Sequence, residues 1–225
     1  MAETLQTLQE KVAALVDQST TPPTVGGSEW LVRTSFINRA LKEWADSYDW
    51  ESLRVISWLN TSGVSGASVL LPTDFKKMAG SPISYDTGVS EGEAWFEIRP
   101  EERDMYATTD KFYYTQGDDA NGYTMYWSPT TLISGASVQI NYYKNQTTLS
   151  SSSDETECPA TEFVIDRTIA YIFEARSDAR FQEMEAKARD KLLLMIDNEN
   201  SKSSAVNNTV KTPEQRYYGF RIGRD

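Results

Sequence analysis

Two segments near the start of the chain carry apolar side chains at the three- and four-residue spacing of an amphipathic helix. The first covers residues 3–17, with apolar positions at Leu5, Leu8, Val12, Leu15 and Val16. A break with prolines and glycines follows, and Ser28 is a good N-cap for a second helix over residues 29–48. Its apolar stripe comprises Trp30, Val32, Phe36, Ile37, Ala40, Leu41 and Trp44. A stripe this dense requires burial.

A third helical pattern covers residues 161–198, and Thr161 is a candidate N-cap. Its apolar positions are Phe163, Ile165, Ile169, Ile172, Phe173, Met184, Ala188, Leu192, Met195 and Ile196. One helix of this length would extend about 58 Å, longer than a small domain. We therefore expect a break near Ser177, with Asp178 suited to cap a following helix. Because stripes this wide need burial, helices from the two ends of the chain should pack together.

From Asp49 onwards the pattern changes to the alternation typical of β-strands. Candidate strands cover residues 53–60, 67–71, 94–99, 111–115, 123–128 and 137–144. Residues 63–66 predict a turn that brings the second strand back along the first. Asn121-Gly122 is a strong hairpin signal between two tyrosine-rich strands. Residues 100–105 should form one short helix with Pro100 in its first turn.

These elements predict an α+β fold, in which a helical bundle from the N- and C-terminal segments carries an inserted antiparallel β-domain and an extended C-terminal arm. The N-terminal helices of the bundle occupy residues 1–48 and the β-rich domain occupies 49–148. The C-terminal helices occupy 149–200 and the arm 201–225. The C-terminal helices are preceded by a serine-rich, acidic linker.

The amino-acid composition excludes several classes of enzyme. The 225 residues include no histidine and one cysteine, Cys158. Histidine triads, imidazole acid–base catalysis and histidine-ligated zinc are thereby excluded, and we expect no catalytic residue, cofactor or metal. Cys158 has no Lys or Arg nearby in the sequence to stabilise a thiolate, so we expect an ordinary side chain. With 22 basic and 33 acidic side chains the net charge is −11, which disfavours a free-standing nucleic-acid binder.

The sequence also indicates whether the chain is expected to enter a membrane or to be secreted. No run of about 18 apolar residues occurs, so we expect no transmembrane helix and no membrane partner. Residues 1–16 are acidic and polar, unlike a secretory signal peptide. The sequence therefore predicts a protein made in a cytoplasm.

Paired carboxylates are the one catalytic chemistry left open, because a glycosidase needs only two of them. Acidic residues crowd one segment, at Glu91, Glu93, Glu97, Glu101, Glu102 and Asp104. Trp95 and Phe96 could supply a sugar-stacking platform there. A chain with 24% charged residues produces such clusters by chance, so a solvated acidic face is favoured. Residues 117–122 suggest a calcium loop, but Ser128 stands where that loop needs a glutamate, so a plain hairpin is favoured.

The middle of the chain is rich in tyrosine and tryptophan, and this pattern has two interpretations. The residues are Trp95, Tyr113, Tyr114, Tyr123, Tyr126, Trp127, Tyr142 and Tyr143. Exposed aromatic side chains on strands can stack on sugars or form protein interfaces. Alternating aromatic residues also pack the inner faces of a small β-sandwich or barrel, and this interpretation is favoured for most of them.

The end of the chain differs in charge from the rest. Residues 201–225 carry five basic and two acidic side chains, a net charge of +3, which leaves −14 for the remainder. Three aromatic residues flanked by arginines stand near the terminus: Arg216, Tyr217, Tyr218, Phe220 and Arg221. One interpretation is a disordered tail. The other is a partner-binding arm that anchors in a groove of another protein.

Taken in order, these segments resemble the head-to-tail adaptor proteins of tailed bacteriophages, also called connector or head-completion proteins. The resemblance covers residues 29–200 and rests on FINRALKEWADSYDWESL, VLLPTDFKKM, FYYTQGDDANGYTMYW, VQINYYK and CPATEFVIDRTIAYIFEARSDARFQEMEAKARDKLLLMI. It implies a helical bundle with an inserted β-domain and a C-terminal segment that docks on the capsid portal. The role of the first helix stays open.

The resemblance further implies a structural virion protein at the head–tail junction, which assembles as a homo-oligomeric, twelve-fold ring. Its partners would be the portal protein, a tail or nozzle protein, and genomic DNA that passes through the channel without sequence-specific binding. An acidic body suits that channel, because strong Lys and Arg contacts would hold DNA in place. The alternative function is an aromatic-rich carbohydrate-binding or glycan-cleaving virion component, which has no need of long amphipathic helices.

We predict that the protein has no hydrolytic activity. Histidine is absent from the chain, and the Asp and Glu residues have no spacing along the sequence that is typical of a catalytic pair. Sugar release from peptidoglycan or polysaccharide should equal that of buffer alone. Turnover that disappears in Glu93→Gln or Glu97→Gln would contradict this prediction.

Overall fold

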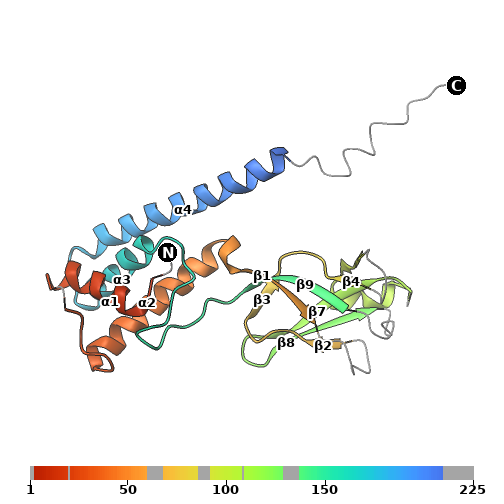
Figure 1. Ribbon diagram of the computed structural model, residues 1–225, viewed down its shortest axis with the longest axis horizontal. Helices are drawn as coiled ribbons and strands as arrows, with labels where there is room; N and C mark the ends of the chain where they lie inside the picture. The colour runs from red at the N-terminus through yellow and green to blue at the C-terminus, as the bar shows by residue number, and fades with distance from the viewer. Residues whose placement is uncertain are drawn as a thin grey trace. The chain divides into compact units, whose positions relative to one another are not determined.

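The computed structural model describes residues 3–19, 21–59, 68–85, 92–107, 109–128 and 137–209, with side chains as far as Lys202. The chain forms two compact units, one made of Met1–Tyr48 together with Leu149–Asp225, the other of Asp49–Thr148. The first is helical and the second is built mainly of strands (Figure 1). The predicted α+β fold class is therefore confirmed.

The helical unit consists of α1 (Leu5–Val16), α2 (Ser28–Ser47), α3 (Glu162–Ala175) and α4 (Phe181–Thr209). α3 packs against α1, α2 and α4, and α1 also packs against α2. Helices from the two ends of the chain therefore share one core, as their apolar stripes predicted. Fully buried side chains of this core include Leu5, Leu8, Trp30, Ile37, Leu41, Trp44 and Phe163.

Two positions of the predicted stripes lie outside this core. Leu15 is 59% exposed and Val32 is 53% exposed. Successive residues of a helix are about 100° apart. Val32 therefore lies about 200° from buried Trp30, and Leu15 lies about 100° from half-buried Val16. The cap assignment at Ser28 was also wrong by one position, because Ser28 is the first residue of α2 and follows the N-cap.

The segment that precedes α3 is bound to α1, although the sequence suggested a plain linker. The Leu5 amide donates a hydrogen bond to the Asp154 carbonyl at 2.8 Å. The Gln6 amide donates to the Ser152 carbonyl at 3.0 Å. First-turn amides of a helix have no acceptor within the helix, so these contacts satisfy donors that would otherwise need water. α1 is thereby fixed to the chain that leads into α3.

The predicted break between the last two helices lies at Ser177, whose backbone has a φ of 53° in the left-handed region. Just ahead of α4, the Asp178 carboxylate accepts a hydrogen bond from the Arg180 amide at 2.9 Å. The hydrogen bond from the Arg180 guanidinium has the larger effect on the pKa of Asp178, and the hydrogen bond from that amide has the next largest. Together they lower this pKa to about 2. The break is confirmed, but Asp178 lies three residues ahead of α4, so it accepts a hydrogen bond from the Arg180 amide and not from an amide of the helix it was expected to cap.

α4 is longer than the pattern indicated, since it continues to Thr209, nine residues beyond Asn200, the last residue expected in the helical segment. Residues 197–209 are mostly polar and weak helix formers, so the apolar pattern stops there. No glycine or proline occurs from Phe181 up to Pro213, however, so nothing in this part of the sequence forces the helix to end. The Tyr48 hydroxyl also donates a hydrogen bond to Asn200 Oδ1 at 2.6 Å.

The second unit is a sandwich of two sheets. One sheet has the order β1-β9-β4-β5, with β3 also paired to β9, and the other has the order β2-β8-β7-β6. The strands are β1 (Arg54–Leu59), β2 (Ser68–Leu70), β3 (Phe75–Met78), β4 (Ile83–Tyr85), β5 (Glu93–Ala94), β6 (Phe96–Glu97), β7 (Phe112–Asp118), β8 (Gly122–Ser128) and β9 (Ser137–Lys144). Two short 3-10 helices, η1 (Glu51–Leu53) and η2 (Pro100–Met105), accompany them. The pairings are antiparallel except for β6 with β7.

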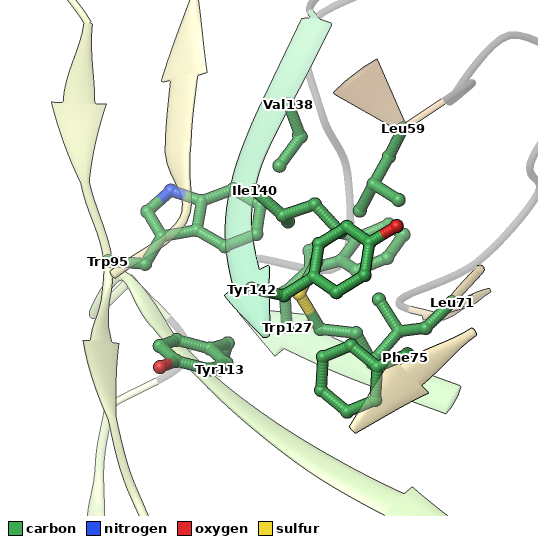
Figure 2. Packing of buried hydrophobic residues seen from close by; sticks show 10 residues of the cluster. Leu59, Leu71, Phe75, Trp95, Tyr113, Trp127, Val138, Ile140 and Tyr142 are labelled. Atoms are coloured by element: carbon green, nitrogen blue, oxygen red, sulfur yellow. The ribbon is translucent and has the colours of Figure 1, made fainter. Parts of the chain in front are cut away.

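Aromatic and aliphatic side chains from both sheets meet in one core (Figure 2). Its members are Leu59, Leu71, Phe75, Trp95, Tyr113, Met125, Trp127, Val138, Ile140 and Tyr142. The Trp95 and Trp127 rings lie 6.0 Å apart between centroids. Four of the eight aromatic residues considered above therefore pack the inside of the sandwich, and Tyr114 stacks on Tyr126 in a smaller cluster.

Three strand predictions need correction. β1 and β2 do not form a hairpin, because β1 pairs with β9 and β2 pairs with β8 in the other sheet. The expected strand over residues 94–99 is divided at Trp95, where the chain passes from the first sheet to the second. Trp95 itself turns into the core. β3 and β4 were missed because each is too short to show an alternating pattern.

The hairpin predicted at Asn121-Gly122 is confirmed, since β7 and β8 pair from Phe112↔Ser128 to Asp118↔Gly122. Gly122 has a φ of 83°, a conformation that L-residues rarely adopt. The Asp118 carboxylate accepts a hydrogen bond from the Asn121 amide at 2.8 Å. Asp118 therefore closes the turn, which is the plain hairpin favoured over a calcium loop.

We predict that Trp44→Ala or Ile169→Ala lowers the free energy of unfolding by about 2–5 kcal/mol, because both side chains lie in the core of the helical unit. Chemical denaturation followed by circular dichroism measures this change. Lys42→Ala, on the exposed side of α2, is the matched control and should have little effect. An equal loss in the control, or none in the core variants, would contradict the packing described here.

Candidate partner-binding surfaces

The five residues predicted to dock on a partner, Arg216, Tyr217, Tyr218, Phe220 and Arg221, lie outside the residues that the structure describes. Their contacts therefore stay a prediction. The structure does describe the helix that leads to them, because α4 continues to Thr209. Six residues separate Thr209 from Arg216.

A groove lies where α4 passes α2 and α3, and two of the carboxylates that line it, Glu43 and Glu185, both bind Arg167. Arg167 Nε donates to Glu43 Oε2 at 2.8 Å, and its Nη1 donates to Glu185 Oε1 at 3.1 Å. The guanidinium also lies 4.5 Å from the centroid of the Tyr171 ring. Burial alone would lower the pKa of Arg167, but Glu43 and its neighbours outweigh that effect and raise it. Arg167 thus stays charged and links α4 to α2.

The groove is lined by apolar and charged side chains together: Glu43, Phe163, Arg167, Gln182, Glu185, Ala186, Arg189, Asp190, Leu192 and Leu193. Glu43 of α2 and Glu185 of α4 both pair with Arg167 of α3. This arrangement holds the three helices together.

A second charged cluster joins the helix ends at the other side of the core. Arg33 is 2% exposed, and its Nη2 donates to Asp17 Oδ2 at 2.5 Å and also to Glu29. Burial would lower the pKa of Arg33, but both carboxylates outweigh that effect and raise it. Arg176 Nη2 lies 3.8 Å from each of the same carboxylates. The end of α1, the start of α2 and the end of α3 therefore meet at one ion cluster.

The candidate glycan site is not assembled as the sequence suggested. Trp95, the expected sugar platform, is 1% exposed, and its Nε1 donates to Ser84 Oγ at 3.2 Å within the sandwich. Glu93 is exposed and paired with Lys111, and Glu97 lies on the other sheet. A glycosidase acid needs an apolar pocket that raises its pKa, and exposed carboxylates do not meet that condition.

Exposed apolar side chains are the surface features that the sequence analysis missed. On α4, Leu193 is 52% exposed and Leu194 is 61% exposed. On β1, Ile56 is 63% exposed and Trp58 is 55% exposed, with the Trp58 ring centroid 5.4 Å from that of Tyr85. Consecutive apolar residues in a helix, as at 192–196, were the available signal, because such a run cannot face one core.

No group of three or more His, Cys, Asp or Glu side chains within the described residues could hold a metal ion. None of the helices is long and apolar enough, over the part of the chain that is described, to cross a membrane. Cys158 is 1% exposed, and burial raises the pKa of its thiol to about 12.

The chain belongs to the SU10 adaptor protein family, whose sequence model matches residues 3–211. It is thus a phage structural protein, and the resemblance to head–tail adaptors noted from the sequence is confirmed. The chain matches none of the curated proteins with which it was compared.

We predict that Cys158 is unreactive in the folded protein, because its raised pKa leaves almost no thiolate at pH 8 and its sulfur is buried. At pH 8, labelling with a thiol reagent such as 5,5′-dithiobis(2-nitrobenzoate) should be slow and should become rapid in guanidinium chloride. Stoichiometric labelling of the native protein within seconds would contradict the burial of this side chain.

Proposed function

We propose that the protein forms a ring beneath the capsid portal, joins the portal to the tail, and continues the channel through which genomic DNA passes. The observation that carries this proposal is the family match, which extends across both compact units and ends at residue 211. An adaptor needs surfaces for copies of itself, for the portal and for the tail. In this assignment the ring is twelve-fold and lies at the head–tail junction of the virion.

The electrostatics support a channel for DNA. The chain has a net charge of −11, which is the sum of −14 on residues 1–200 and +3 on residues 201–225. Phosphate contacts to Lys and Arg give DNA binding most of its sequence-independent affinity. A channel wall with an excess of carboxylates repels the phosphate backbone of DNA instead, so DNA can move through the ring without being held.

The predicted arm, residues 201–225, supplies the portal contact in this proposal; its first nine residues belong to α4 and the others follow that helix. Its net charge of +3 is opposite to that of the body, and three aromatic residues stand between arginines. Buried aromatic anchors contribute most of the energy of many interfaces, and Arg pairs well with carboxylates of a partner. Eight residues span at most about 28 Å, so Tyr217 must dock within that distance of the end of α4 at Thr209.

We predict that deletion of residues 215–225 abolishes attachment to purified portal and leaves thermal stability nearly unchanged. Ordering the arm costs conformational entropy, so the aromatic contacts must supply most of the gain in binding. Biolayer interferometry on immobilised portal measures affinity, and a circular-dichroism melt measures stability.

A matched pair of full-length variants separates aromatic burial from arm length. Changing Tyr217, Tyr218 and Phe220 together to Ala should weaken binding by at least about a hundredfold, in the range of hot-spot losses. The double change Tyr217→Phe and Tyr218→Phe keeps the rings and should retain most of the affinity. Undiminished portal binding by the truncated chain would refute the arm's role.

A further inference from the structure

The outer face of the sheet β1-β9-β4-β5 carries a pair of aromatic rings. β1 and β4 lie on the two sides of β9, because both strands pair with it. Trp58 of β1 is 55% exposed, and its ring centroid lies 5.4 Å from that of half-buried Tyr85 of β4. Two strands with a third between them are about 9.6 Å apart, so these side chains lean towards each other over β9.

The register of β9 places an amide side chain beside these rings. Val138 and Ile140 point into the core of the sandwich (Figure 2). Gln139 between them therefore lies on the outer face, since successive residues of a strand point to opposite faces. Its partners in the register are Trp58 on one side and Ile83 on the other. Among the residues that the structure describes, the Gln139 amide group has no hydrogen-bond partner, so it is free to bind a ligand.

The charged groups of this face are paired with one another, although the chain is acidic overall. Arg54 Nη1 lies 3.3 Å from Glu51 Oε2, and its Nε donates to Asn141 Oδ1 at 2.9 Å. Lys77 Nζ lies 2.6 Å from Asp49 Oδ1. The outward positions of β1, β4 and β9, over their described residues, include no Asp or Glu. The hydrogen-bonding groups left free are neutral, which favours an uncharged ligand.

The Tyr85 ring is fixed by a close approach of the backbone at Gly92. A Cβ atom at this position would lie 2.7 Å from Cε1 and from Cζ of Tyr85, and closer still to Cγ2 of Ile83. Only a residue without a Cβ leaves room for both side chains. The ring is therefore held in place before a ligand binds, which lowers the entropic cost of binding.

We propose that this face binds a neutral glycan of β-linked pyranose units. The C–H face of such a sugar is apolar and stacks on an exposed ring such as that of Trp58. Its hydroxyl groups can bond to the Gln139 amide and to the Tyr85 hydroxyl. An apolar protein partner would instead bury that amide without a hydrogen bond, which is unfavourable. Because the outward strand positions carry no carboxylate, the glycan is bound and not cleaved.

Tryptophan fluorescence reports selectively on this site. The chain has six tryptophans, and five of them are at most 3% exposed: Trp30, Trp44, Trp50, Trp95 and Trp127. Acrylamide, a neutral quencher, should therefore act mainly on Trp58. Chitohexaose and cellohexaose should protect this fluorescence from acrylamide. Hexagalacturonate, an acidic oligosaccharide of the same length, should not, because the chain has a net charge of −11.

Isothermal titration calorimetry with the protecting oligosaccharide measures the contribution of each group. Trp58→Ala and Gln139→Ala should each weaken binding by at least about tenfold, and Gly92→Ala should weaken it by displacing Tyr85. Trp58→Phe keeps an aromatic ring and should retain most of the affinity. Leu70→Ala, at an exposed residue of the other sheet, is the matched control and should bind like the wild type. Circular-dichroism melts confirm that each variant folds.

Fluorescence that stays equally quenched with both neutral oligosaccharides, or binding that survives Trp58→Ala, would overturn the glycan site. Equal protection by hexagalacturonate would overturn the neutral ligand. Protection of Trp58 by purified portal or tail protein in place of the sugars would show a protein interface and would overturn the proposal as well. The inference goes beyond the adaptor function and does not depend on it, so none of these results bears on assembly of the ring.

Discussion

Burial of α3 is the constraint on which the helical unit depends. Its buried residues are Phe163, Val164, Ile165, Asp166, Thr168, Ile169, Ala170, Tyr171, Ile172 and Phe173. A helix that is apolar on nearly every side needs neighbours all around it. α1 and α2 come from the start of the chain and α4 from the end, so this unit forms only when both ends meet. The intervening residues 49–148 are thereby left to fold around a core of their own.

The way in which α1 and α4 pack on α3 also explains why parts of these two helices stay exposed. α4 is about twice as long as the helix it covers, so one part is held by Arg167 and Lys191 while the rest has no α3 beneath it. α1 is held through the backbone of residues 152–154, which gives the first helix a structural role and leaves Leu15 exposed.

The sequence predicted the helices well because their signal is local. Spacing of apolar residues located α1, α2 and the break at Ser177, and the Asn121-Gly122 turn located the β7–β8 hairpin. Sheet membership depends on distant partners, and alternation along one strand does not name them, so β1 and β2 were wrongly joined. Trp95 looked like a ligand platform because sequence alone does not show which side of a strand faces the core.

Assembly on the portal is tested most directly by electron cryomicroscopy of the protein mixed with purified portal. The expected result is a closed ring of twelve copies stacked coaxially on the portal, with a continuous central channel. Particles that show bare portal beside unassembled single chains, at concentrations well above those of a virion assembly reaction, would contradict this mode of assembly.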